Sequence, residues 1–221
     1  MEALSLIASS YNYLHKYLDD ESYTKPSPIP SSSPLELLQR LANDDRFEGF
    51  LSERAGDDCE TLYEKVKFEP LIMEYWNAWM IDDPKKNFEE SQKAAVMLLV
   101  ATIKDDKKEL YDFFLLHLLT TSHAVRILLP LVPGQFHINL VRQWWLLALT
   151  TYVGQLRPKF DEKLIEGVKI EDKKWNYVTD KATKGPYATD EHYVKGEVLS
   201  YGYHSAPTLR VLTKFMQDVE P

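Results

Sequence analysis

Two long apolar stretches, at residues 110–132 and 135–156, dominate the hydrophobic pattern of this chain. Each is long enough for several helical turns and is apolar on most sides, which is typical of a buried helix. Only a short break at Pro133 and Gly134 separates them, so we expect two antiparallel helices packed against each other. Strand signals are weak, with no useful alternating run and no Asn-Gly hairpin. We therefore predict an all-α fold, a multi-helix bundle around this buried pair.

Polar residues inside the two stretches need an explanation, because a buried polar group costs free energy unless it is hydrogen-bonded. We expect each of them to have a partner in the fold. They are Asp112, His117, His123, Arg126, Arg142 and Gln143.

The segments before the central pair predict shorter helices. Residues 2–18 carry apolar residues at helical spacing. Residues 21–34, ESYTKPSPIPSSSP, have the composition of a flexible, exposed Pro/Ser linker. Ser33-Pro34-Leu35-Glu36 has the pattern of a capping box with proline at the first helical position. We expect the whole chain, residues 1–221, to form a single α-helical domain.

Further boundaries are marked by proline and acidic residues. A helix is predicted from Pro70, with Tyr75 and Trp76 in its buried stripe, and it should end at Asp82-Asp83-Pro84. The next helix is predicted at residues 88–103. A charged region after Pro158 should be anchored on the core by Trp175 and Tyr177. A final long helix should begin at Glu191 or His192.

Composition and charge exclude some classes of protein. The net charge of −8 comes without a Lys/Arg-rich run, which argues against nucleic acid as a partner. Cys59 is the only cysteine, so an intramolecular disulfide is impossible and a reducing compartment fits. The N-terminal sequence shows no secretory signal. Residues 110–132 could nearly span a bilayer, but their charged and histidine residues argue against it. We expect a cytoplasmic protein with no membrane partner.

The motifs of several large enzyme classes are missing from the sequence. It contains neither G-x-G-x-x-G nor a P-loop, and the eight glycines are scattered. It also lacks G-x-S-x-G, and Cys59 lies in an acidic context that makes it a poor nucleophile.

The histidines are the remaining candidates for chemistry. His117 is flanked by apolar residues in FFLLHLL, and could be either a satisfied core histidine or a ligand. His192 and Lys195 are three residues apart and share one helical face, as an exposed pair or as part of a site. The other histidines carry less signal. His15 and His137 are explained most simply as surface or capping residues, while His123 and His204 stay open.

Several stretches, taken together and in order, resemble the questin oxidase-like family. DFFLLHLLTTSHAVRILLPL at 112–131 is similar to a family signature that leads into a long helix. LVRQWWLLALTTYVGQLRPKF at 140–160 resembles a helix that ends in an Arg-Pro motif. EALSLIASSYNYLHKYLDD at 2–20 and DEHYVKGEVLSYGYHSA at 190–206 also match.

The resemblance implies an oxidoreductase of fungal secondary metabolism. It implies a Baeyer–Villiger-type or iron-dependent oxygenation that opens a ring of an anthraquinone-type aromatic polyketide, with NADPH as a cofactor. It also implies a non-haem iron site, in which His117 and His192 are ligands and Lys195 is a carboxylated lysine. The chemistry is consistent, since iron that activates O₂ favours imidazole and carboxylate ligands. A buried lysine also loses its proton more readily, which permits addition of CO₂.

The resemblance covers the C-terminal half of a longer enzyme, whose first half holds further histidines that this chain lacks. We therefore expect an incomplete metal site, with the missing N-terminal half or a second copy of the chain as a possible partner. The alternative is a non-catalytic helical interaction module or a truncated gene product. Four aromatic residues of the central pair are expected to line a flat apolar pocket or to be plain core: Phe113, Phe114, Trp144 and Trp145.

Overall fold

The computed structural model describes residues 15–55, 68–102, 112–161, 163–166 and 175–190. Within these residues the regular structure is helical, apart from two isolated β-bridges, and this confirms the predicted all-α class. The elements are η1 (Glu21–Tyr23), α2 (Pro34–Ala42), η2 (Asp45–Phe47), α4 (Phe68–Ala78), α5 (Pro84–Val100), α6 (Phe113–Leu128), η3 (Gly134–Phe136), α7 (His137–Gly154), α8 (Lys163–Glu166) and α9 (Trp175–Lys184). The final long helix, predicted to begin at Glu191 or His192, lies outside the described residues.

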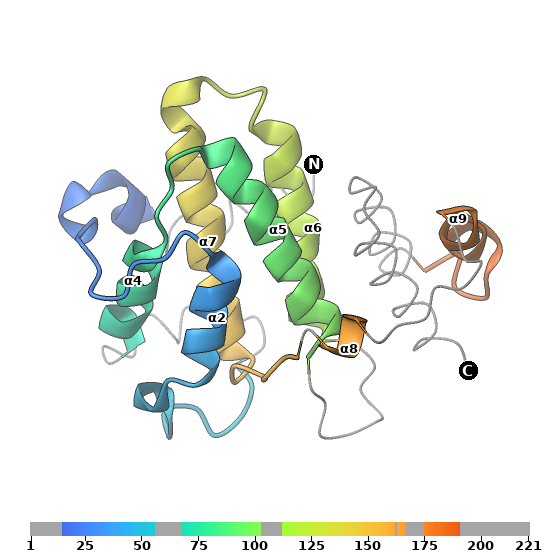
Figure 1. Ribbon diagram of the computed structural model, residues 1–221, viewed down its shortest axis with the longest axis horizontal. Helices are drawn as coiled ribbons and strands as arrows, with labels where there is room; N and C mark the ends of the chain where they lie inside the picture. The colour runs from blue at the N-terminus through green and yellow to red at the C-terminus, as the bar shows by residue number, and fades with distance from the viewer. Residues whose placement is uncertain (1–14, 56–67, 103–111, 162, 167–174, 191–221) are drawn as a thin grey trace.

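Helices α5, α6 and α7 contact one another and form the centre of the bundle, with α4 and α2 packed on it (Figure 1). α6 and α7 correspond to the two apolar stretches of the sequence, and a short connection that contains η3 joins them. Asp112 starts α6, because its carboxylate accepts hydrogen bonds from the backbone N–H groups of Phe114 and Leu115 at 2.9 and 3.0 Å. The indole Nε1 of Trp144 on α7 donates to the carbonyl of Leu118 on α6 at 3.3 Å.

The capping residues place the helix starts, and one of them corrects a predicted boundary. The backbone N–H of Glu36 donates to the hydroxyl of Ser33 at 3.2 Å, as the capping pattern predicts for α2. The Asp83 carboxylate likewise accepts from the backbone N–H groups of Lys85 and Lys86, so that α5 begins at Pro84. The prediction placed this start at Phe88, four residues too late, because it treated Asp83-Pro84 only as the end of the preceding helix.

Residues 21–34 were predicted as a flexible linker, and the structure shows them bonded along α4. The backbone N–H of Ser31 donates to the carbonyl of Ala78 at 2.9 Å, and that of Met80 donates back to Ser31 at 3.0 Å. The side-chain oxygen of Asn77 accepts from the backbone N–H of Lys25 at 3.1 Å. A Pro/Ser composition does not reveal such bonds, because the partners lie about fifty residues away in the sequence.

The core lies between α5, α6 and α7 and the helices α2 and α4 that pack on them, and aromatic side chains fill much of it. Trp76 and Trp145 are among the largest fully buried residues. The rings of Trp79 and Trp145 meet edge to face at 5.3 Å, and those of Phe88 and Trp144 at 5.4 Å. Buried indoles keep their N–H groups bonded where they can: Trp145 donates to the carbonyl of Tyr75 at 3.3 Å.

α9 forms a separate small cluster. Its buried Val178 packs against Trp175 and Tyr177, and Figure 1 shows the helix apart from α2, α4, α5, α6 and α7. The described apolar contacts of Trp175 and Tyr177 lie within this cluster, and their anchoring of the region on the main core stays a prediction.

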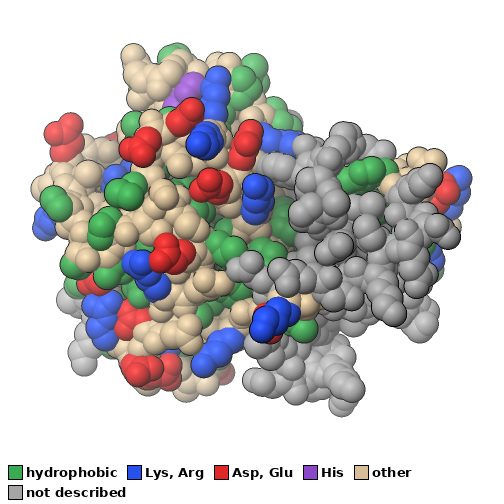
Figure 2. All heavy atoms as spheres, viewed as in Figure 1, with side chains coloured by type: hydrophobic (Ala, Val, Ile, Leu, Met, Phe, Trp, Pro, Cys, Tyr) green, Lys and Arg blue, Asp and Glu red, His purple; other side chains and the backbone are tan. Residues whose placement is uncertain are grey.

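The described helices and surface add to two arguments made from the sequence, one against a membrane span and one against nucleic acid as a partner. No helix among the described residues combines the length and the apolar character that a membrane span requires. Figure 2 shows acidic and basic side chains interspersed over one face of the bundle rather than gathered by sign.

Candidate functional site

The candidate site begins with one face of α6, where five residues follow each other at helical spacing: Phe113, His117, Thr120, Ala124 and Ile127. We call this face the α6 outer face. Phe113 and Ile127 are each 50% exposed, whereas the residues of the opposite side of α6, such as Leu115, are buried in the core. α6 therefore keeps an apolar surface that contains a histidine outside the main core.

The imidazole of His117 is half-buried and packs edge to face against the ring of Phe113, with centroids 4.5 Å apart. The hydroxyls of Thr120 and Thr121 donate to the backbone carbonyl of His117, at 3.0 and 2.8 Å. These hydroxyls are therefore engaged with the helix backbone. The immediate surroundings of the imidazole on its own helix are thus aromatic.

The structure describes only one member of the predicted iron ligand set. His117 lies on α6, whereas His192 and Lys195 lie outside the described residues. Among the residues that the structure describes, no group of three or more His, Cys, Asp or Glu side chains could hold a metal ion. The described part contributes His117 alone to the expected donor set and does not form an iron site without further ligands.

The four aromatic residues suggested for a flat pocket divide between two environments. Trp144 and Trp145 are 4% and 0% exposed and belong to the core. Phe113 is half-exposed on the α6 outer face, and its ring meets that of Phe114 at 5.4 Å. The structure thus favours a core role for the two tryptophans and leaves only the phenylalanines beside His117.

The other described histidines of the central pair have local roles. Nδ1 of His123 lies 2.8 Å from a guanidinium nitrogen of Arg126. Burial, followed by the charge of Arg126, lowers the pKa of His123. Nε2 of His137 lies 3.0 Å from the carbonyl of Val132, at the connection between α6 and α7. Both histidines therefore fit structural roles.

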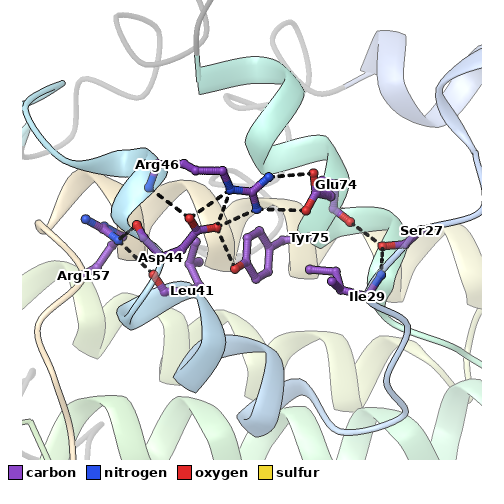
Figure 3. A network of polar contacts seen from close by, with 8 residues as sticks. All are labelled: Ser27, Ile29, Leu41, Asp44, Arg46, Glu74, Tyr75 and Arg157. Atoms are coloured by element: carbon purple, nitrogen blue, oxygen red, sulfur yellow. Dashed lines mark hydrogen bonds and ion pairs between the residues drawn. The ribbon is translucent and has the colours of Figure 1, made fainter.

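A polar network at the ends of α2 and α4 escaped the sequence analysis (Figure 3). The Arg46 guanidinium donates to both carboxylate oxygens of Asp44, at 2.6–3.1 Å, and to both oxygens of Glu74, at 2.9 and 3.0 Å. The Tyr75 hydroxyl donates to Asp44 at 2.9 Å. The hydrogen bonds from Arg46 lower the pKa of Asp44, and burial raises the pKa of Tyr75 to about 12. Adjacent unlike charges in the sequence do not reveal this network, because half of it comes from α4.

Arg157 is a second residue that spacing did not single out. It follows Leu156 after the end of α7. Both residues have left-handed backbones, with φ values of 65° for Leu156 and 51° for Arg157. Such a conformation costs a non-glycine residue about 1 kcal/mol or more. The guanidinium donates to the carbonyls of Leu41 and Asp44, at 3.0 and 2.7 Å, and to the carboxylate of Glu48 at 2.8 Å. Arg157 thereby ties the end of α7 to the C-terminal end of α2.

A third arginine, Arg142 on α7, is partly buried and stacks on an aromatic ring. Its guanidinium carbon lies 3.6 Å from the ring centroid of Trp76, and one nitrogen donates to Asn77 at 3.2 Å. Burial lowers the pKa of Arg142 to about 10. When the guanidinium is buried it loses favourable interactions with water, and stacking on the Trp76 ring replaces part of them.

With the geometry of α6 established, the sequence comparisons identify the family. The model of the family described as questin oxidase-like matches residues 1–196. The chain belongs to the questin oxidase-like family. The match includes α6 with His117 and the end of α7 with Arg157. No curated protein shows significant similarity to the chain. Membership of the questin oxidase-like family indicates an oxidoreductase.

Proposed function

We propose that this questin oxidase-like protein takes part in oxidative ring opening of an anthraquinone-type polyketide in fungal secondary metabolism. The observation that carries the proposal is the position of His117 inside the family match, on a half-exposed aromatic face of α6. An oxygenase of flat aromatic molecules requires an apolar surface beside the reactive group, and Phe113 supplies one next to the imidazole.

In the proposed reaction, one atom of O₂ is inserted between a ring carbonyl carbon and its neighbour, which gives a ring ester. The other atom leaves as water, with two electrons from NADPH and two protons, one of which comes from NADPH itself. Water then opens the ester to an acid and a phenol. This stoichiometry balances, and it needs no oxidant other than O₂.

The residues proposed to hold a non-haem iron are His117, His192 and a carboxylated Lys195. When bound there, iron would supply the activation of O₂. Since the described residues provide only His117, we assign no step to the metal. The part proposed for this chain's own side chains is limited to positioning: Phe113 presents a ring face to the substrate, and His117 holds its imidazole beside that ring.

The proposal is tested by turnover of a hydroxyanthraquinone with the full chain, Fe(II), NADPH and ¹⁸O₂. We expect a product that carries one ¹⁸O atom from the insertion step, and we expect His117→Ala to abolish it. His123→Ala is the matched control, because His123 lies on the same helix but pairs with Arg126. Equal turnover by both variants would contradict the proposal. So would a lack of turnover both by this chain and by a version extended upstream to supply the ligands expected to be missing.

A non-catalytic interaction module is the second candidate, and one observation favours it. Apolar side chains are exposed around the connection between α6 and α7: Leu131 is 74% exposed, Phe136 49% and Ile138 45%. Exposed apolar groups that lie together often mark a protein interface. A chain that turns over no substrate and sediments as a dimer would favour this second function.

A further inference from the structure

A small cleft lies beside the end of α7, outside the α6 outer face. Its volume is about 200 Å³. Its wall is mixed: phenylalanine, leucine and valine side chains lie beside one arginine and one glutamate, and polar and apolar atoms line it to a similar extent. The lining residues are Phe47, Glu48, Gly49, Leu51, Phe68, Val153, Leu156 and Arg157.

The guanidinium of Arg157 is buried and held in a fixed position. The Arg157 side chain is only 8% exposed, and the backbone carbonyls of Leu41 and Asp44 accept two of its hydrogen bonds. Its carbon also lies 5.1 Å from the ring centroid of Phe47, which lines the same cleft. A cation that is already oriented loses little conformational entropy when it binds an anion.

The carboxylate that pairs with Arg157 is, by contrast, weakly held. Glu48 accepts from Arg157 at 2.8 Å, but its side chain is 72% exposed. An exposed carboxylate keeps most of its hydration and can leave such a pair at small cost. An anion that is itself buried in the cleft, however, stabilises the buried guanidinium more strongly than the exposed carboxylate of Glu48 does. Another carboxylate can therefore compete with Glu48 for Arg157.

The size of the cleft limits the ligand. A cavity of about 150 Å³ accommodates benzene, so about 200 Å³ accommodates a single ring with a carboxylate. Drug-sized ligands occupy pockets of at least about 300 Å³, and a three-ring anthraquinone is therefore too large. The phenylalanine, leucine and valine side chains suit an aromatic ring.

We propose that this cleft binds a small monocyclic aromatic carboxylate, whose carboxylate pairs with Arg157 in place of Glu48. In the absence of ligand, Glu48 occupies the position that the ligand's carboxylate takes. The inference uses no residue of the α6 outer face and does not depend on the proposed oxygenase activity.

The experiment measures binding of 4-fluorobenzoate to the full chain by ¹⁹F NMR titration. We expect a dissociation constant of about 1 mM, as for other small fragments. Glu48→Gln should tighten binding by up to about fivefold, because it removes a competitor whose exposed ion pair is weak. Neutral 4-fluorobenzyl alcohol should bind at least about tenfold more weakly than the acid.

Glu53→Gln is the matched control, because Glu53 is an exposed acid of the same loop that does not line the cleft. It removes the same charge and should leave the affinity within about twofold. Equal tightening by both variants would show a general charge effect and overturn the proposal. So would equal affinity for the acid and the alcohol, or no binding to wild type and Glu48→Gln at 10 mM of ligand (about ten times the expected constant).

Arg157→Lys tests the guanidinium itself and should weaken binding by about tenfold, because lysine lacks the planar fork. Circular dichroism must show that the variant is folded, since Arg157 also ties α7 to α2. If this variant does not fold, the comparison of Glu48→Gln with Glu53→Gln still decides the proposal. Full affinity in folded Arg157→Lys would contradict it.

Discussion

α6 and α7 have similar sequences, but the α6 outer face is partly exposed whereas the second half of α7 is buried. Both helices are rich in leucine and aromatic residues, with few charges. In the second half of α7, the successive residues Ala148, Leu149 and Thr150 are all fully buried although they point in different directions around the helix. On α6, Phe113 and Ile127 remain 50% exposed. The apolar character of a helix thus does not show whether a given residue belongs to the core or to a surface that can bind a ligand.

Polar groups show the difference more clearly than apolar ones. The indole N–H groups of Trp144 and Trp145 bind backbone carbonyls of neighbouring helices. Such bonds fix each tryptophan in one position, since a buried donor without a partner is costly. The imidazole of His117 is instead half-buried beside an exposed ring. The two indoles thus belong to the core, and the half-buried imidazole lies on a face of α6 that stays partly exposed.

The largest effect that we predict follows from the core side of this comparison. Trp145→Ala should lower the free energy of unfolding by about 4 kcal/mol, because it leaves a large cavity and removes the contact with Trp79. Urea unfolding followed by circular dichroism measures this loss. A loss below about 1 kcal/mol would mean that α7 is not the buried centre of the bundle.

Much of the helical framework could be predicted from the sequence, because its signals are local. The two apolar stretches and the capping residue Ser33 depend on neighbours within four positions. The start of α5 was displaced, since Asp83-Pro84 can both end one helix and begin another. The bonds of residues 21–34 to α4 were missed because they join segments far apart in the chain.

The candidate site could be predicted only in part. His117 stood out because a histidine within FFLLHLL is unusual, and the structure adds its aromatic neighbour Phe113. The roles of His192 and Lys195 stay predictions, since both lie outside the described residues. Arg157 gave no signal in spacing, because its function depends on a left-handed backbone and on carbonyls of α2.

The polar network provides an intermediate case, with an effect that depends on pH. Asp44→Asn should lower the free energy of unfolding by about 2 kcal/mol at pH 7, because it removes charge-assisted hydrogen bonds to Arg46 in a partly buried position. Asp45→Asn is the control, since Asp45 is exposed and its side chain forms no ion pair with the residues that the structure describes. Urea unfolding should show a much smaller change for Asp45→Asn.

The sign of the pH effect follows from the pKa of Asp44, which lies below its ordinary value of 3.8 in the folded protein. The unfolded chain therefore takes up a proton first as the pH falls. The stability that Asp44 contributes is complete above about pH 5 and is lost as the pH falls through the folded-state pKa. The difference between wild type and Asp44→Asn should shrink below pH 4. A difference that stays constant from pH 7 to pH 3 would assign the effect to shape rather than charge.

The smallest effect on stability is expected on the α6 outer face, where Phe113→Ala should cost less than about 1 kcal/mol. Its ring is half-exposed and loses only the contacts with Phe114 and His117. If the proposed oxygenase stacks its substrate on this ring, the same variant should raise KM by about tenfold, the magnitude of one aromatic contact. Ile127→Ala is the matched control, because Ile127 has the same 50% exposure on the same face but lies about 21 Å further along the helix than Phe113. It should change stability equally little and leave KM unchanged. Equal KM values for the two variants would remove Phe113 from the substrate site, and the α6 outer face would then differ from α7 only in its exposure.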